Sequence, residues 1–433
     1  MPVLWKSAIA VVLTVIALGL RVAIAEEGWT AKCIVLEGTP EEVGAEFAKL
    51  NGTKIRADFE RFVKENRSVL TTGRRYLEIT KKLAPHWLAE AVAVAKEIGV
   101  DPTLYGIYLG AKYRGVNAGH ECISYAATGK AAKGDKALLH KLRQNRFRLQ
   151  GAYFKKIVVE GKCLHRFLRL GDVHGLESCM FVNEKGLAGC HVQCGRDPEP
   201  RWKGWMTHSL SRYIAENAAT CQEALDILKM TCEEGVYAGG KIGTRWTFAD
   251  ASGKIVTALQ HARAVSKIDW AREKGFVLNK GKFPSQDDLP VDALAMNEAL
   301  RRETGLCSLT AEVPKEHPEF LTCAWVSLGN PSSVYVPLFM GGRGTPVSIA
   351  DGTLHLLNRS ADKGRMIAEA PRFEKEAQAK KQKVEQRAAS LLKAGKKTEA
   401  VQLLTKFNTE ITLAAEEFVK SLPRAGKKEQ AAQ

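Results

Sequence analysis

Cys122 is the residue whose type and position first indicate chemistry. It opens the stretch CISYAATGKAAKGDKALL, residues 122–139, where a helical composition gives way to short apolar runs separated by glycines. A thiolate is a strong nucleophile, whereas a lone cysteine before a strand is more often a small core residue. The signatures of other catalytic classes, GxSxG, HExxH, GxGxxG and GxxxxGK followed by Ser or Thr, are absent from the sequence. Cys122 is therefore the leading candidate for a nucleophile.

The other cysteines do not indicate a metal site. The chain holds ten cysteines, and Cys190 and Cys194 frame the run CHVQC, but no second cysteine or histidine pair at zinc-ligand spacing accompanies it. We predict that these thiols are buried or paired in disulfides, which persist in exported proteins. No motif for a bound cofactor is present, so none is predicted.

The first 25 residues have the pattern of a secretory signal. Lys6 precedes an apolar run from Ala8 to Leu20, and residues 23–25, AIA, are small enough for cleavage. The run is shorter than the roughly 20 apolar residues that a membrane-spanning helix needs. We therefore expect an exported protein, periplasmic or extracellular, with an uncleaved membrane anchor as the alternative.

Periodicity divides the rest of the chain into three segments. Residues 26–121 are predicted to be mainly helical: Thr39 and Glu42 form a capping box, and the helix in APHWLAEAVAVAKEIGV stops at Gly99. Residues 122–355 alternate short strands with glycine turns, and FVNEKGLAG and FADASGKIV are typical of antiparallel hairpins. Residues 356–433 are again helical. A strand-rich core with interleaved helices predicts an α+β fold.

The net charge of +16 raises the question of an anionic partner. Much of the excess lies in the last sixty residues or so, where lysines mix with glutamates and alanines as on a solvated helix face. No nucleic-acid-binding motif is found, so a nucleic-acid partner is not predicted. Contact between this basic tail and a membrane surface is the less favoured alternative, and nothing indicates the oligomeric state.

Several segments, taken in order, resemble the N-terminal-nucleophile (Ntn) linear-amide C–N hydrolase superfamily, which includes isopenicillin N acyltransferase, penicillin V acylase and bile salt hydrolase. They are ECISYAATGKAAKGDKALLHK, FVNEKGLAG, THSLSRYIAENAATCQEALDIL, TFADASGKIVTALQ and GFVLNKGKF, within residues 85–285. These segments are most similar to the isopenicillin N acyltransferase branch. The C-terminal part, with TCAWVSLGNPSSVYVPLFMGG, resembles the secreted dipeptidase branch instead.

The resemblance implies an αββα sandwich and a precursor that cuts itself. The Cys122 thiol would cleave the bond after Glu121 through an N-to-S acyl shift, so that residues 26–121 are a pro-segment and 122–355 the Ntn domain. Cys122 would then carry a free α-amine, whose pKa near 8 allows it to take the thiol proton without a separate histidine. The thiolate would attack an amide carbonyl and form a thioester.

Two oxyanion donors follow from the same resemblance. Asn279 in FVLNKGKF matches the family asparagine that binds the oxyanion, although read alone it is equally a turn residue before Gly281. Gln193 aligns with a second donor position of the bile salt hydrolase branch.

The sequence departs from the family where an arginine and an aspartate usually follow the nucleophile. In HKLRQN, Lys141 stands at the arginine position and Gln144 at the aspartate position. Lysine keeps the charge but lacks the bidentate fork, and glutamine lacks the carboxylate. A shifted register would make Arg143 the functional arginine, and Glu121 replaces the glycine that precedes the nucleophile in the fungal acyltransferase.

The expected function is hydrolysis or acyl transfer at a linear amide, with Cys122 as nucleophile and base. The substrate is a small-molecule amide or a short peptide; N-acyl amides come first and dipeptides second. The missing aspartate keeps a third hypothesis open, in which the fold is a non-catalytic binding protein whose pro-segment is never removed. Nothing in the sequence identifies the acyl chain or the amine.

Overall fold

Local sequence signals set the limits of the first helices. The computed structural model describes residues 32–113, 122–145, 148–271, 275–279, 286–330 and 332–425, so the predicted signal, 1–25, lies outside the described residues. Helix α2 (Pro40–Glu65) begins with the predicted capping box, in which the Thr39 side chain accepts from the Glu42 N–H and the Glu42 carboxylate from the Thr39 N–H. Helix α5 (Pro85–Glu97) ends just before Gly99, whose φ of +70° favours glycine.

The other helices follow in chain order. They include α3 (Arg67–Leu70), α4 (Arg74–Leu83), α6 (Pro102–Ala111), α7 (Thr207–Asn217), α8 (Cys221–Glu233), α9 (Ala293–Ala299), α10 (Pro318–Leu321), α11 (Val347–Ala350), α12 (Thr353–Ser360), α13 (Lys363–Lys393) and α14 (Lys397–Ser421). Within the described ranges, none of them combines the length and the hydropathy that crossing a membrane requires.

Two sheets lie at the centre. The eight-stranded sheet has the order β11-β10-β9-β8-β7-β6-β5-β2, the six-stranded sheet the order β12-β3-β4-β13-β14-β15, and β1 pairs with β16. The strands are β1 (Cys33–Ile34), β2 (Leu36–Gly38), β3 (Ile123–Ala127), β4 (Lys136–Arg143), β5 (Gln150–Ile157), β6 (Phe167–Asp172), β7 (Met180–Asn183), β8 (Ala188–Arg196), β9 (Ile242–Ala249), β10 (Ile255–Gln260), β11 (Val265–Trp270), β12 (Phe276–Asn279), β13 (Cys307–Pro314), β14 (Cys323–Leu328), β15 (Val336–Phe339) and β16 (Thr345–Pro346). Both predicted hairpins are confirmed as β7–β8 and β9–β10.

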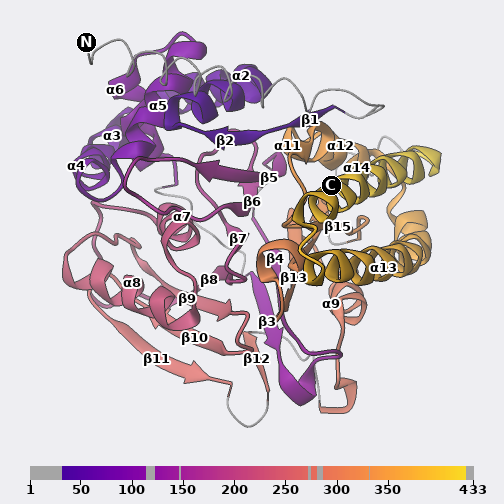
Figure 1. The fold of residues 1–433 in the computed structure, drawn as a ribbon. Helices are drawn as coiled ribbons and strands as arrows, with labels where there is room; N and C mark the ends of the chain where they lie inside the picture. Colours follow the sequence, from indigo (N-terminus) through magenta and orange to yellow (C-terminus); the bar gives the residue numbers. More distant parts are fainter. Residues whose placement is uncertain are drawn as a thin grey trace, which may run out of the picture. The chain divides into compact units, whose positions relative to one another are not determined.

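The layers run helix, sheet, sheet, helix. Apolar residues of the two sheets, among them Leu170 of β6 and Leu139 of β4, meet in one core cluster. Helices α7 and α8 cover the outer face of the eight-stranded sheet, where Leu210 and Leu228 pack against Trp246 of β9. In Figure 1, α13 and α14 lie on the opposite side of the strands. The predicted α+β fold with an αββα sandwich is confirmed.

The N-terminal helices are tied to the sheet by buried charges. Glu90 of α5 is fully buried, and its carboxylate pairs with Lys155 of β5 and with Arg212 of α7, the latter at 2.6 Å. Arg212 also pairs with Glu216 at 2.8 Å, and Glu216 accepts a hydrogen bond from the indole N–H of Trp87 at 2.7 Å. Breaking one partner of a buried pair leaves an uncompensated charge, so this network fastens α5 to the sandwich.

The expected disulfides are not formed. All ten cysteines lie in described ranges and are free thiols, so the predicted pairing is wrong, whereas the predicted burial is confirmed for six of them. Five of these six lie within strands or helices, as Cys190 does in β8 and Cys323 in β14, where a thiol acts as a small apolar side chain.

We expect acid to weaken the attachment of α5. Burial opposes ionisation of Glu216, but Arg212 and His86 outweigh it and lower the pKa of Glu216 to about 2, from an ordinary value of 4.5. The stabilisation by Glu216, about 3 kcal/mol in full, is therefore present above pH 4.5 and lost as the pH falls toward 2. Denaturant unfolding of the wild type and of Glu216→Gln should differ most near neutral pH and converge on acidification. A difference that does not change with pH would contradict this.

Candidate active site

Cys122 lies directly before β3, an inner strand of the six-stranded sheet. Side chains alternate along a strand, and Ile123 packs on the side away from the other sheet, with α9 residues in its cluster. Ser124 faces the other sheet, because its Oγ lies 3.3 Å from Thr247 Oγ1 of β9. Cys122 shares the face of Ser124. Its half-buried thiol therefore points toward the space between the sheets.

Strand β4 pairs with β3, and extending the β3–β4 register by one residue places β4 beside Cys122. Ser124 pairs with Lys141, which makes Cys122 and Arg143 the next residues on that face. The Cys122 sulfur lies 3.8 Å from the carbonyl oxygen of Gln144, in agreement with this register. The structure thus brings Lys141 and Arg143 together beside the candidate nucleophile.

The side chains of Lys141 and Arg143 are both buried. Lys141 is 1% exposed and Arg143 is 3% exposed. Lys141 Nζ donates to the carbonyl oxygen of Cys179 at 3.2 Å, across the space between the sheets. Positive charge in such a low-dielectric position stabilises a thiolate or an oxyanion strongly.

A carboxylate that the sequence analysis missed holds Arg143. Asp172, at the end of β6, is fully buried, and its Oδ1 accepts from Arg143 Nη1 at 2.6 Å and from Gln150 Nε2 at 2.8 Å. Its Oδ2 accepts from Arg148 Nη1 at 3.1 Å and from the Tyr113 hydroxyl at 3.5 Å. Burial opposes the charge on Asp172, but these guanidinium groups hold its pKa well below the usual range.

Gln144 does not take the place of that carboxylate. Its side-chain Nε2 donates to the carbonyl oxygen of Thr304 at 3.0 Å. Asp172 lies 50 residues after Cys122 in the other sheet, and its only signal in the sequence is an acidic residue that closes the strand FLRLGD. Neither strand alone shows that Asp172 faces Arg143 of the other sheet.

The two predicted oxyanion donors are placed differently. Asn279 is the last residue of β12, whose register pairs it with Ser124, two positions from Cys122. Gln193 is exposed, and it lies three residues after Cys190, whose side chain belongs to the core between the sheets. Strand alternation therefore puts Gln193 on the opposite face of β8, away from the thiol. The donor roles of both residues stay predictions.

Two histidines near this region are uncharged. The rings of His191 in β8 and His208 in α7 lie 5.2 Å apart, and Tyr113 stacks on His208 at 3.9 Å. Burial, together with Lys141 and Arg143, lowers the pKa of both histidines well below the usual range. They therefore add no positive charge at neutral pH.

The neighbouring thiols are poor nucleophiles. Burial raises the pKa of Cys190 to about 11, although Lys141 opposes it, and burial also raises the pKa of Cys179. Because the thiolate is the reactive form, these two cysteines are structural. Cys122 is the half-buried thiol on this face and so the reactive candidate.

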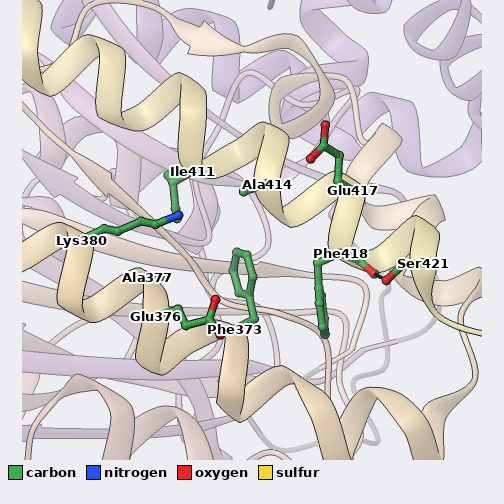
Figure 2. Close-up of a pocket in the computed structure, with 9 residues that line it drawn as sticks. All are labelled: Phe373, Glu376, Ala377, Lys380, Ile411, Ala414, Glu417, Phe418 and Ser421. Carbon is green, nitrogen blue, oxygen red and sulfur yellow. Dashed lines mark hydrogen bonds between the residues drawn. The ribbon is translucent and has the colours of Figure 1, made fainter.

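A cavity of about 320 Å³ lies elsewhere, between α13 and α14 (Figure 2). Phe373 and Phe418 stack there with ring centroids 5.3 Å apart, and Glu376, Lys380 and Glu417 stand at its edge. All its lining residues come from these two helices, so it is separate from the Cys122 site.

Removing the Asp172 charge should destabilise the sandwich. Asp172→Asn leaves Arg143 buried without a counter-charge, which costs about 3–5 kcal/mol. The matched control is Asp135→Asn, because Asp135 pairs with Lys315 at the surface, where an ion pair contributes about 0–1 kcal/mol. Denaturant unfolding of both variants measures the two costs. Equal, small losses would show that Arg143 does not depend on Asp172.

No family model matches the chain, and no curated protein matches it. Solved structures that match include penicillin V acylase from Agrobacterium tumefaciens, with 11% identity, a TM-score of 0.36, and coverage of 51% of this chain and 86% of that chain. The Caenorhabditis elegans ortholog of N-acylethanolamine-hydrolyzing acid amidase has 12% identity, a TM-score of 0.31 and coverage of 44% and 92%. A variant of conjugated bile acid hydrolase from Clostridium perfringens has 16% identity, a TM-score of 0.27 and coverage of 37% and 54%. All three names describe an acylase, an amidase or a hydrolase.

Proposed function

We propose that this chain is an exported Ntn amide hydrolase or acyltransferase that becomes active when the bond between Glu121 and Cys122 is cut. The position of Cys122 carries the proposal: its thiol points between two sheets, beside the buried cations Lys141 and Arg143. Cations at this place favour the thiolate and the oxyanion that its attack creates.

The proposed reaction uses the two groups of Cys122 itself. The α-amine accepts the thiol proton, and the sulfur attacks the amide carbon. When the tetrahedral intermediate collapses, the carbon–nitrogen bond breaks and the α-ammonium returns its proton to the leaving amine. Water, or a second amine, then attacks the thioester carbon and gives its proton to the α-amine. The carbon–sulfur bond breaks, the α-ammonium returns the proton to the Cys122 sulfur, and the acyl product leaves. Asn279 is the proposed oxyanion donor, because β12 pairs with β3 beside Cys122.

Cleavage should not separate the N-terminal segment from the rest. Strand β2 is part of the eight-stranded sheet, next to β5, and Glu90 of α5 is held by the buried network described above. Lys112, just after α6, pairs with Glu177 at 2.9 Å, and both side chains are 1% exposed. Each of these contacts survives a cut after residue 121, so the two fragments stay together.

The binding-protein hypothesis is weaker than the enzyme hypothesis. The binding-protein hypothesis depended on Gln144, which stands where the family has an aspartate and so lacks its carboxylate. Asp172 gives Arg143 a carboxylate partner from the other sheet, so this loss no longer argues against catalysis. No contact among the described residues favours a dipeptide over another amide.

Intact-mass analysis of the purified protein tests the proposal. Wild type should give two fragments that meet at residues 121 and 122, elute together from gel filtration and part only in denaturant. Cys122→Ala should stay whole and lose more than about 10³-fold of any amidase activity. Cys163→Ala, at an exposed cysteine, should behave as wild type. An uncut wild-type chain without turnover would refute the proposal.

A further inference from the structure

The charges buried around Cys122 do not balance. Lys141 and Arg143 are both at most 3% exposed, whereas the carboxylate beside them on this face is Asp172 alone within the described part of the chain. Asp172 pairs with Arg143 at 2.6 Å. Arg169 does not belong to this face, because it alternates along β6 with Leu168 and Leu170, whose side chains lie in the core between the sheets.

Nearby groups do not cancel this excess. The carboxylate of Glu177 is matched by Lys112. His191 and His208 are uncharged at neutral pH because burial lowers the pKa of each. Arg148, which is 27% exposed, adds a further cation to Asp172 rather than an anion. The inner face beside Cys122 therefore carries net positive charge.

Lys141 is the cation on this face that pairs with no described carboxylate. An ammonium group has three N–H donors, and the described acceptor for Lys141 is the Cys179 carbonyl oxygen. Arg143 is bound by Asp172 and Gln150. An ammonium held out of water without a counter-ion is costly, so an anion that binds there is favoured.

We propose that Lys141 binds a carboxylate of the substrate. This rests on the proposed function, since it names the class of amide: an N-acyl amino acid or another amide that also carries a carboxylate. Lys141 pairs in register with Ser124, two residues from Cys122 on the same face, so a carboxylate a few bonds from the scissile amide reaches it while the thiol reaches the carbonyl carbon. Lys141 is then a specificity-determining residue and not the base.

Matched substrates test this. N-octanoylglycine and N-octanoylethanolamine share an acyl chain and differ in the carboxylate. Wild type should prefer the glycine compound. Lys141→Met should lower kcat/KM for the glycine compound by roughly tenfold to a hundredfold more than for the ethanolamine compound, which is the worth of a charge-assisted hydrogen bond, while the loss for the ethanolamine compound reports the stabilisation of the thiolate and oxyanion. Lys141→Arg should recover part of the loss, and Lys229→Met, on the exposed side of α8, should change neither rate.

The outcomes separate this inference from the proposed function. Turnover of the neutral compound alone, or an equal loss for both compounds in Lys141→Met, overturns the inference while the amidase stands. If wild type turns over neither compound, calorimetric binding of N-octanoylglycine decides the inference, and if the wild-type chain is also uncut, the proposed function fails. If wild type binds N-octanoylglycine and Lys141→Met does not, the inference is upheld. If wild type does not bind the compound, the inference is overturned as well.

Discussion

The ion pair between Arg143 and Asp172 is the contact on which the arrangement at Cys122 depends. Arg143 belongs to β4 of one sheet and Asp172 to β6 of the other, so the pair joins the two sheets. A buried charge that loses its partner is costly, so this contact fixes how the end of β4 faces the end of β6. Cys122 is the neighbour of Arg143 in the register, and the same contact therefore fixes where its thiol points.

A second set of buried charges ties the N-terminal helices to the sandwich. Glu90, Arg212 and Glu216 lie at the outer face of the eight-stranded sheet, so they share no residue with the Arg143 pair. Ion pairs contribute little net stability when they are complete, but they penalise any packing that leaves one partner alone. The two networks thus specify the position of α5 on one side and of β4 on the other, while apolar burial supplies the stability.

The sequence contains most of the local structure and little of the site. Capping at Thr39, the glycine stop at Gly99 and both hairpins depend on neighbours in the chain, and these predictions are confirmed. Asp172 could not be recognised, because its partner Arg143 lies in the other sheet and no local pattern encodes how two sheets stack. The position of Gln193 could have been predicted from strand alternation alone, because Gln193 lies three residues after the buried Cys190 and therefore on the other face of β8.

The C-terminal helices show the same limit of local patterns. Their mixture of lysine and glutamate predicts a solvated face, and the outward positions agree with it. The inward positions do not: Lys381 of α13 is buried and pairs with Glu312 of β13, and Phe407 of α14 packs on Phe339 of β15. A helix in the outer layer of a sandwich buries one face, where its side chains are apolar or form ion pairs, and exposes a polar face to water. The amino-acid composition of the helix does not distinguish these two faces. Lys381 is therefore neutralised inside the fold, and the lysines of this segment do not all lie on its solvated face.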